Sequence, residues 1–472
     1  MGKPTSINIR GLRGDRRAKE LKGMDLSRVI VLAIDPARDY PKALICDYFG
    51  GVLEKPFFFA VNSEGIFSLH KKVQYWANCV RAQRVFVGIE VAGCYHNAIA
   101  DALEQLGYEV NQVNSVTTFY ERIKMLDYSK SDDKDLLSIA QAIIANNGLS
   151  PKRVTGFYEV MQSVCRARRK LIKERSAVKA QIRQLMTKVF REFQGLVDPE
   201  SFKQEKVFDF WGKKSRFIMS CCPLPSQILS LNKAGLTQLA ALVKLKFTDH
   251  EIELLLKAAE RSLPSSPELI AFDGDQVQFR LKQLEYLDNQ VAALELRMEE
   301  MLVQTPALLL LSVKGIGMVT AAEFIAEVGF IFKYTHKRQL IKLAGTNPVL
   351  SQSGGKQGRA YKISRQGNPA LRYIVTLIGK NLCSKKNGNT YFADYYERLF
   401  RRGKTPSQVY VAAGNKFLGI ALAMLRGQTT FHVPGFEECT SDVLKKLTRT
   451  KNIEGAREVL SLADSKKQLV CS

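Results

Sequence analysis

Four carboxylates in the N-terminal third of the chain have the residue types and spacing of metal ligands. Asp35 ends the apolar run V-I-V-L-A-I, Glu90 ends the run V-F-V-G-I, and Asp132 and Asp135 follow in S-D-D-K-D-L. Buried strands seldom end in acids, because an uncompensated carboxylate is costly to remove from water. Carboxylate oxygens are, however, the ligands that Mg²⁺ takes. The four acids therefore predict a site for divalent metal ions.

The chemistry of such a site is phosphoryl transfer. Two metal ions about 4 Å apart can activate an oxygen nucleophile and stabilise the leaving oxygen of a phosphodiester. A single acid of this kind is more often a cap, and Asp132 could cap the helix that follows it. The order of all four acids and their places in the predicted elements favour a nuclease-type site over capping.

Residues 28–150 contain the elements that would position these acids. Three strands followed by alternating helices and strands is the order of the ribonuclease-H-like fold. Asp35 ends the first strand and Glu90 the fourth, where that fold needs acids. Asp132 and Asp135 are three residues apart, so one face of the last helix carries both. The predicted strands are 28–35, 43–50, 57–62, 84–91 and 108–113, and the predicted helices are 67–82, 95–106, 115–126 and 132–146.

The charge balance of the chain indicates a polyanionic partner. Its 472 residues include 70 basic and 46 acidic ones, with a net charge of +24 spread along the chain. An excess of this kind favours nucleic acid, because neutralising phosphates releases counterions. Ribosome-like or membrane-surface binding, and the absence of any polyanion, are the alternatives.

Cysteine usage and hydropathy predict a cytoplasmic protein without a membrane partner. The nine cysteines are scattered, and the five histidines lack ligand spacing, which argues against a zinc site. No stretch approaches the roughly 18 uncharged apolar residues of a membrane span. The N-terminus is basic and polar, without the apolar core of a signal peptide.

The rest of the chain divides into an extension, a connector, a C-terminal domain and a tail. Apolar residues recur at helical spacing in 157–193 and 277–302. These helices could form an antiparallel pair or a dimerising coiled coil, and an ordinary bundle explains the pattern equally well. The predicted boundaries are 1–27 for a basic extension, 28–150 for the catalytic domain, 151–302 for a connector with an inserted helical lobe at 195–275, 303–430 for the C-terminal domain and 431–472 for a peripheral tail.

The C-terminal domain opens with a possible phosphate-binding turn. The sequence V-K-G-I-G contains Lys314, Gly315 and Gly317 and precedes a predicted helix at 320–329. This pattern is typical of a helix-hairpin-helix module, whose backbone amides bind a phosphate without reading sequence. A plain turn between two core helices is the alternative.

A segment rich in serine and glycine follows, beside a basic cluster. A serine among glycines has an accessible hydroxyl, and nearby cations could hold a scissile phosphate. No histidine lies nearby as a base, so a nucleophilic serine would need activation from elsewhere, for instance from a metal. Spacing alone does not rank Ser351, Ser353 and Ser364, and most loop serines are structural. The basic residues expected to contact DNA or RNA are Lys356, Arg359, Lys362, Arg365 and Arg372.

Together these motifs resemble the DEDD-type transposases of insertion-sequence family one-ten, also called bridge-RNA-guided recombinases. The likeness covers the N-terminal domain and residues from about 303 to 425, in the same order. The motifs that carry it are A-I-D-P at 33–36, G-I-E at 88–90, K-S-D-D-K-D at 130–135, K-G-I-G-M-V-T-A-A at 314–322, L-A-G-T-N-P at 343–348, Q-S-G-G-K at 352–356 and I-S-R-Q-G-N-P-A-L-R at 363–372.

The resemblance implies a RuvC-like N-terminal domain, a coiled-coil connector and a mainly α-helical C-terminal transposase domain. It implies that four acids bind magnesium and that Ser353 of Q-S-G-G forms a covalent link to DNA. Asp133 is an additional acid beside Asp132, and either could be a ligand. Members are thought to join the metal site of one subunit to the serine of another, within a dimer or tetramer. A structured noncoding RNA would pair with donor and target DNA. The acids implied are Asp35, Glu90, Asp132 and Asp135.

The sequence is therefore interpreted as that of a site-specific DNA recombinase that excises and inserts a mobile element under the guidance of RNA. One rival is a Holliday-junction-type nuclease, which would use metal-activated water and form no covalent intermediate. The other is a non-catalytic scaffold that binds nucleic acid through the same fold. A protein–DNA adduct separates the first rival from the recombinase, and the effect of Asp35→Ala on activity separates the second.

Overall fold

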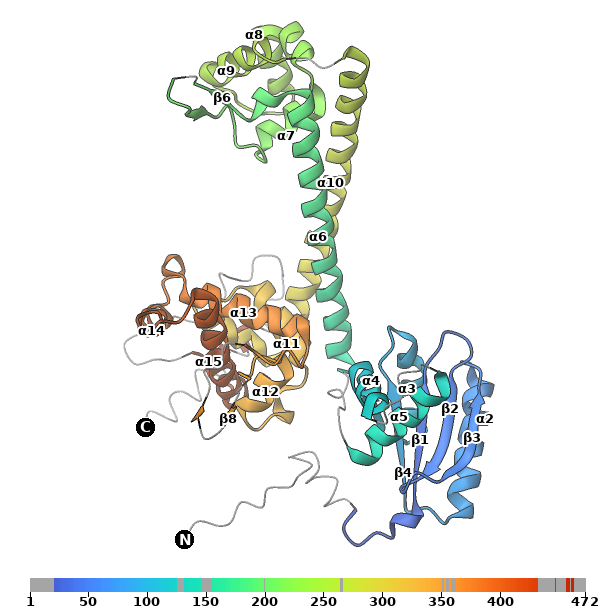
Figure 1. The fold of residues 1–472 in the computed structure, drawn as a ribbon. Helices are drawn as coiled ribbons and strands as arrows, with labels where there is room; N and C mark the ends of the chain where they lie inside the picture. The colour runs from blue at the N-terminus through green and yellow to red at the C-terminus, as the bar shows by residue number, and fades with distance from the viewer. Residues whose placement is uncertain are drawn as a thin grey trace. The chain divides into compact units, whose positions relative to one another are not determined.

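The protein consists of two compact units, Met1–Arg153 and Val154–Ser472 (Figure 1). The computed structural model describes residues 21–124, 131–146, 154–198, 200–263, 266–349, 362–431, 446, 456–458 and 460–461, with the backbone alone at 352–353 and 356–357. The four predicted acids belong to the first unit, and the predicted serine and the basic cluster belong to the second.

The first unit is built on a five-stranded mixed sheet of order β3-β2-β1-β4-β5. Strand β1 is parallel to β4, and β4 is parallel to β5, whereas β2 is antiparallel to both β1 and β3. This arrangement fits the predicted ribonuclease-H-like fold. The strands are β1 (Val29–Asp35), β2 (Lys42–Asp47), β3 (Val52–Phe58), β4 (Arg84–Glu90) and β5 (Val110–Val113).

Strand β3 begins five residues before the predicted position, at Val52 instead of residue 57. A tight turn after β2 explains the difference. The carboxylate of Asp47 accepts hydrogen bonds from the amides of Phe49 and Gly51, which closes the hairpin early. The aromatic residues that led to the prediction mark the end of the strand, not its start.

Alternating side chains of β1 form two cores, one on each face of the sheet. Ile30, Leu32 and Ile34 pack toward α2 (Ser63–Cys79) and α3 (Tyr95–Gln105). Val29, Val31 and Ala33 pack with apolar residues of α5 (Asp132–Ala145). Helix α4 (Ser115–Lys124) lies against α5. The period of two thus decides which face of the sheet each terminal acid can reach.

The second unit begins with two long helices, α6 (Phe157–Val189) and α10 (Pro267–Val303), which lie side by side (Figure 1). Helix α10 starts well before the predicted residue 277. Ser266 caps it by accepting a hydrogen bond from the amide of Leu269, and Pro267 occupies its first position. Both are start signals that apolar periodicity does not register.

Ion pairs between α6 and α10 fix the register of the two helices. Arg168 on α6 donates to Glu295 on α10 through Nε (2.8 Å) and Nη2 (2.6 Å). Seven residues farther along α6, Arg175 pairs with Asp288, which lies seven residues back along α10, at 3.2 Å. The helices are therefore antiparallel. A shift in register would leave buried charge unpaired, which is costly.

Apolar residues from one end of this helix pair form the core of a small helical lobe. Val178, Ile182, Leu281 and Leu284 pack with residues of the segment between the two helices. The described elements of the lobe are η2 (Arg191–Gln194), β6 (Leu196–Val197), β7 (Gln204–Glu205), α7 (Lys213–Cys221), α8 (Pro225–Leu242) and α9 (Asp249–Glu260).

The other end of the helix pair joins the C-terminal core. Met161 and Leu302 are buried there, and so are Ala456 and Leu460, so part of the predicted tail contributes to the core. The described elements of this part are η3 (Pro306–Ser312), α11 (Met318–Val328), η4 (Ile331–Lys333), α12 (Lys337–Ala344), β8 (Gln352–Ser353), β9 (Lys356–Gln357), α13 (Pro369–Cys383), η5 (Lys385–Asn387), α14 (Thr390–Arg401) and α15 (Pro406–Gly427).

Helix α15 is long and apolar enough to cross a membrane by length and composition alone. It packs closely against α13, however. A Cβ at Gly379 of α13 would lie 1.9 Å from the carbonyl oxygen of Tyr410, and one at Gly414 would lie 2.4 Å from that of Val375. The helix therefore has the packing of a core helix.

We expect Gly88→Ala to destabilise the first unit, because the new Cβ would lie 2.4 Å from Cγ1 of Ile143 on α5. Overpacking of this kind lowers the free energy of unfolding by about 1–3 kcal/mol. Trp76 and Trp211 are the two tryptophans of the chain. In a Trp211→Phe background, Trp76 fluorescence during urea denaturation therefore reports on the first unit.

Ile143→Ala provides the control for this prediction. It removes the Cγ1 and Cδ1 atoms that the new methyl group at residue 88 would meet. The additional cost of Gly88→Ala should shrink in that background, because contacting residues couple in a double-mutant cycle. An equal cost in both backgrounds would show that β4 and α5 do not press together here.

Candidate functional site

Asp35 and Glu90 lie side by side at the ends of two neighbouring strands. In the parallel register, Ile34 pairs with Ile89, so the two acids are the next pair along β1 and β4. Adjacent strands are about 4.8 Å apart. Both acids are half-buried. The register thus brings together two carboxylates that are far apart in the sequence.

Both acids face the side of the sheet that α5 covers. Asp35 has the same parity as Ala33, which packs in the core beneath α5. Glu90 has the same parity as Gly88, whose Cβ position points at Ile143 of α5. Side chains two residues apart share a face of a strand. Helix α5 therefore begins with its acids on the face to which Asp35 and Glu90 belong.

The first turn of α5 holds Asp132, Asp133 and Asp135, and the hydroxyl of Ser131 caps the helix. Acids are favourable here because the amide end of a helix is partly positive. Asp132 is exposed, whereas Asp135 is buried. Both acids lie on one helix, but the face that they were predicted to share gives them different environments.

Asp135 forms a buried ion pair with Arg122 of α4. The Nη1 atom of Arg122 lies 2.5 Å from Oδ1 of Asp135, and the side chains are only 12% and 9% exposed. A guanidinium in this position compensates the carboxylate for the loss of water. Arg122 was not predicted from the sequence.

Asp133 pairs with Lys42, which stands opposite Asp35 in the antiparallel register of β1 and β2. Residues directly opposite each other project from the same face of a sheet. The ammonium group of Lys42 thus links the edge of the sheet at Asp35 to the first turn of α5. The sequence left open whether Asp133 or Asp132 is the metal ligand. In the structure Asp133 is paired with Lys42.

The four acids have the donor chemistry of magnesium ligands, but within the described residues they are not gathered into a metal-binding cluster. Carboxylates are hard oxygen ligands, and Mg²⁺ needs only a few of them because it keeps several waters. Within the described ranges, no group of three or more His, Cys, Asp or Glu side chains is close enough to hold a metal ion. The pairings of Asp135 with Arg122 and of Asp133 with Lys42 account for two of the acids.

In the second unit, Ser353 lies in a short hairpin, paired with Lys356 between β8 and β9. Only the backbone is described at these two residues, and Ser351 and Arg359 lie outside the described residues. Backbone pairing holds the base of the hairpin together. Pro348 bridges Ile363. The amide of Val349 donates to the carbonyl oxygen of Lys362 at 2.9 Å.

Two of the other predicted residues help to build this base. The hydroxyl of Ser364 donates to Oδ1 of Asn347 at 2.6 Å, a structural role. Arg372 donates through Nη1 to the carbonyl oxygens of Ala344 (3.3 Å) and Arg365 (3.0 Å). Part of the predicted phosphate-binding cluster therefore holds backbone. Arg365 and Lys362 have exposed positions beside the hairpin.

The V-K-G-I-G segment forms a turn that precedes α11, as predicted. Gly315 has a φ of +94°, and Gly317 caps the helix, which starts at Met318, two residues before the predicted start. The element before the turn is the 3₁₀-helix η3, not an α-helix. Lys314 is exposed, and its carbonyl oxygen accepts a hydrogen bond from Asn389 at 3.0 Å.

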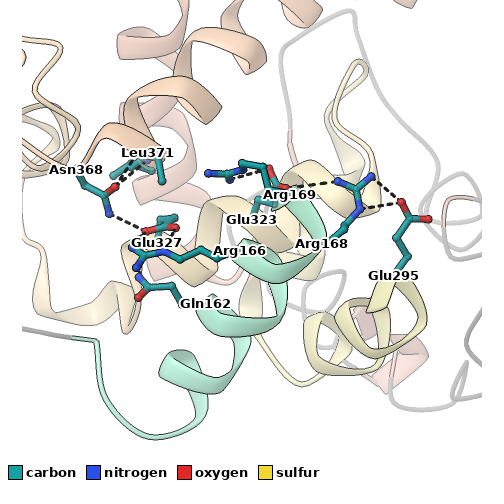
Figure 2. A network of polar contacts seen from close by, with 10 residues as sticks. Gln162, Arg166, Arg168, Arg169, Glu295, Glu323, Glu327, Asn368 and Leu371 are labelled. Carbon is teal, nitrogen blue, oxygen red and sulfur yellow. Dashed lines mark hydrogen bonds and ion pairs between the residues drawn. The ribbon is translucent and has the colours of Figure 1, made fainter. Parts of the chain in front are cut away.

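A network of polar residues joins α6 to the C-terminal core (Figure 2). Glu323 and Glu327 on α11 face the arginines of α6. Arg169 donates to Glu323 at 3.0 Å. Arg166 donates to Glu327 through both Nε and Nη2, each at 2.9 Å. The hydrogen bond to Glu327 raises the pKa of the Arg166 guanidinium, which therefore stays charged.

Comparison with known proteins links both sets of residues to one class of protein. Residues 32–191 match a family of IS110-type DEDD transposases. Residues 307–397 match the Transposase IS116/IS110/IS902 family. The first match contains the four acids, and the second contains Ser353.

Individual relatives are distant. A 42 kDa protein of insertion element IS900 from Mycobacterium paratuberculosis is 27% identical over 238 residues, which make up 48% of this chain and 57% of that protein. The pilin gene-inverting protein of Moraxella bovis is 25% identical over 187 residues, or 40% of this chain and 57% of that protein. A 44.8 kDa protein of insertion element IS116 from Streptomyces clavuligerus is 28% identical over 120 residues, 25% of this chain and 29% of that protein. The chain thus spans little more than half the length of the first two relatives.

We expect Arg122→Gln to lower the free energy of unfolding of the first unit by about 3–5 kcal/mol, because it leaves Asp135 buried without its cation. The measurement is urea denaturation followed by Trp76 fluorescence in the Trp211→Phe background. Arg38→Gln is the matched control, since Arg38 and Asp39 are 82% and 69% exposed. Loss of such a surface pair should cost less than about 1 kcal/mol. Equal costs would show that burial adds nothing to the Arg122–Asp135 pair.

Proposed function

Because the chain belongs to the IS110 family of transposases, we propose that it is a DNA recombinase that excises and inserts a mobile element through a phosphoserine intermediate. The observation that supports this most is the coincidence of each family match with one predicted set of residues. The acids lie in the first match and Ser353 in the second. The similarity to a pilin gene-inverting protein supports the same reaction class, DNA strand exchange.

In this proposal Asp35, Glu90, Asp132 and Asp135 hold magnesium. When bound, the metal would supply Lewis-acid activation of phosphodiester oxygens. The residues of the chain prepare that site in two ways. The strand register holds Asp35 and Glu90 side by side. The cations Arg122 and Lys42 offset the negative charge of Asp135 and Asp133 at the first turn of α5.

Ser353 is the proposed nucleophile. Its Oγ attacks the scissile phosphorus, and the new P–Oγ bond forms as the bond from phosphorus to the leaving deoxyribose oxygen breaks. The serine proton is released, and the leaving oxygen takes up a proton to become a hydroxyl. In the second step a DNA hydroxyl attacks the phosphoserine and frees the serine. One phosphoester replaces another at each step, so rejoining needs no external energy source.

The proposed partners are donor DNA, target DNA, a structured guide RNA and further copies of this chain. The net charge of +24 supports binding to polyanions. Lys314, Lys362 and Arg365 are exposed cations in the second unit, available for phosphate contacts. The remaining predicted nucleic-acid contacts are Gly315, Gly317, Lys356, Arg359 and Arg372.

A hydrolytic junction nuclease is the second candidate function. The observation that favours it is that the acids of the first unit share one face of the sheet, an arrangement that metal-activated hydrolysis could use without any serine. The two candidates differ in one product. Only the recombinase forms a covalent protein–DNA species.

Ser353→Ala should abolish that species and leave nucleic-acid binding intact, because the substitution removes the attacking oxygen alone. The measurement is a denaturing gel of the full chain with its co-purified RNA and labelled element-end DNA. Ser351→Ala is the matched control, since Ser351 is close in sequence and the variant should keep the adduct, whereas Ser364→Ala would also remove the hydrogen bond to Asn347 at the hairpin base. An adduct that persists in Ser353→Ala would refute the assignment. Magnesium-dependent cleavage by the wild type without an adduct would favour the nuclease.

Magnesium should raise the thermal unfolding midpoint of the first unit, because a ligand that binds only the folded state stabilises it. The gain is about 2.7 kcal/mol at a concentration 100 times the Kd. Asp35→Asn should remove this response, whereas Asp39→Asn should keep it because Asp39 is 69% exposed and pairs with Arg38. The midpoint is measured by Trp76 fluorescence, with and without oligonucleotide DNA. The same magnesium response in Asp35→Asn and the wild type would exclude Asp35 as a ligand.

A further inference from the structure

We propose that Glu327 is a positioning residue for the serine hairpin, because it ties the base of that hairpin to helix α6. The inference rests on the proposed role of Ser353. It assigns a function to a buried carboxylate that the recombinase mechanism does not otherwise use. The connection runs from Arg166 on α6, through Glu327 on α11, to Asn368 at the start of α13 (Figure 2).

The carboxylate of Glu327 is fully buried and accepts hydrogen bonds from three side chains on two sides. Arg166 donates two, from Nε to Oε1 and from Nη2 to Oε2, each at 2.9 Å. Gln162 donates to Oε2 at 3.0 Å. Asn368 donates from Nδ2 to Oε2 at 2.7 Å. A carboxylate held by this many donors has a single orientation, so it transmits position from one helix to the next.

Asn368 connects this carboxylate to the hairpin. Its Oδ1 caps α13 by accepting from the amides of Ala370 (2.9 Å) and Leu371 (3.1 Å). The backbone amide of Asn368 donates to the carbonyl oxygen of Leu343 at 2.7 Å. The residue is thus fixed by a helix, by a backbone segment and by Glu327. The neighbouring Gly367 packs closely against the same segment, because a Cβ there would lie 2.5 Å from the carbonyl oxygen of Leu343.

The segment just before Asn368 is one leg of the hairpin. The amide of Arg365 donates to the carbonyl oxygen of Gly345 at 3.0 Å, and that of Ser364 donates to Asn347 at 2.9 Å. These bonds lead directly into the pairing of Pro348 with Ile363. A displacement of Asn368 would therefore be passed to both legs of the hairpin that carries Ser353.

The same network contains a natural comparison. Arg168 and Glu295 form an ion pair between α6 and α10, with side chains 16% and 10% exposed, against 53% and 0% for Arg166 and Glu327. Glu295 is bonded to Arg168, whereas Glu327 is also bonded to Asn368, which caps α13. Buried ion pairs contribute little net stability but can fix geometry. If Glu327 matters only for packing, it should behave like Glu295.

Asn368→Asp tests the connection with little change elsewhere. Aspartate keeps the oxygen that caps α13, and it is as good a cap as asparagine. The substitution removes the hydrogen-bond donor to Glu327 and places a second carboxylate beside that of Glu327, which it repels. The double variant Glu327→Gln with Asn368→Asp reverses the donor and acceptor and restores one hydrogen bond and the net charge. Glu295→Gln is the control.

Two readouts are made on the full chain with its co-purified RNA. Hydrogen exchange at residues 345–368 reports on the base of the hairpin, and the single-turnover rate of adduct formation reports on Ser353. In Asn368→Asp we expect faster exchange and a loss of about 10- to 100-fold in rate, because small misplacements of a reacting group have effects of that size. DNA affinity should stay within about twofold. The double variant should recover both readouts in part, because the side-chain nitrogen that Glu327→Gln introduces also faces the donors of Arg166 and Gln162. Glu295→Gln should match the wild type in both.

Three outcomes would overturn the inference. One is unchanged exchange in Asn368→Asp, another is faster exchange with a normal adduct rate, and the third is an equal rate loss in Glu295→Gln. Failure of the proposed function looks different, because the wild type itself would then form no adduct. In that case hydrogen exchange alone decides whether Glu327 anchors the hairpin.

Discussion

Three arginine–carboxylate pairs among the described residues satisfy the same constraint: a carboxylate taken out of water meets a cation from another element. Asp135 meets Arg122 of α4, and Glu295 meets Arg168 of α6. Glu327 meets Arg166 in the same way. The desolvation cost of each ion is recovered only at one relative position of the two elements. These pairs therefore fix where α5, α10 and α11 lie against their neighbours.

These ion pairs position different parts of the two units. In the first, the paired Asp135 and Asp133 fix the acidic turn of α5 beside the sheet edge that ends in Asp35 and Glu90. In the second, Glu327 is bonded to the residue that caps α13 and begins the hairpin leg. Apolar packing alone would tolerate small slides of one helix on another. Directional charge-assisted hydrogen bonds do not, and the proposed mechanism needs both its acids and its serine positioned to a fraction of an ångström.

The parts of the site that depend on the periodicity of a single strand or helix could be predicted from the sequence. Strand alternation and the parallel register follow from the apolar runs that end in Asp35 and Glu90, so their meeting at one edge was predictable. The pairing of Asp135 with Arg122 was not, because the two residues lie on different helices with no shared period. Glu323 and Glu327, four residues apart in the apolar helix α11, were a readable signal of buried ion pairs. The early start of α10 was marked by Ser266 and Pro267, which an apolar count ignores.

The distribution of charge poses a last physical problem, since an acidic site must accept a polyanion. The chain as a whole is strongly basic, which draws nucleic acid to it through counterion release. Locally, the phosphates and the carboxylates repel unless cations stand between them. Arg122 and Lys42 supply that charge for two acids, but each is engaged by one carboxylate. Further positive charge must come with the substrate or from a metal ion. In the proposed mechanism, the strands that hold Asp35 and Glu90 side by side would thus make the binding of DNA and the binding of magnesium mutually favourable.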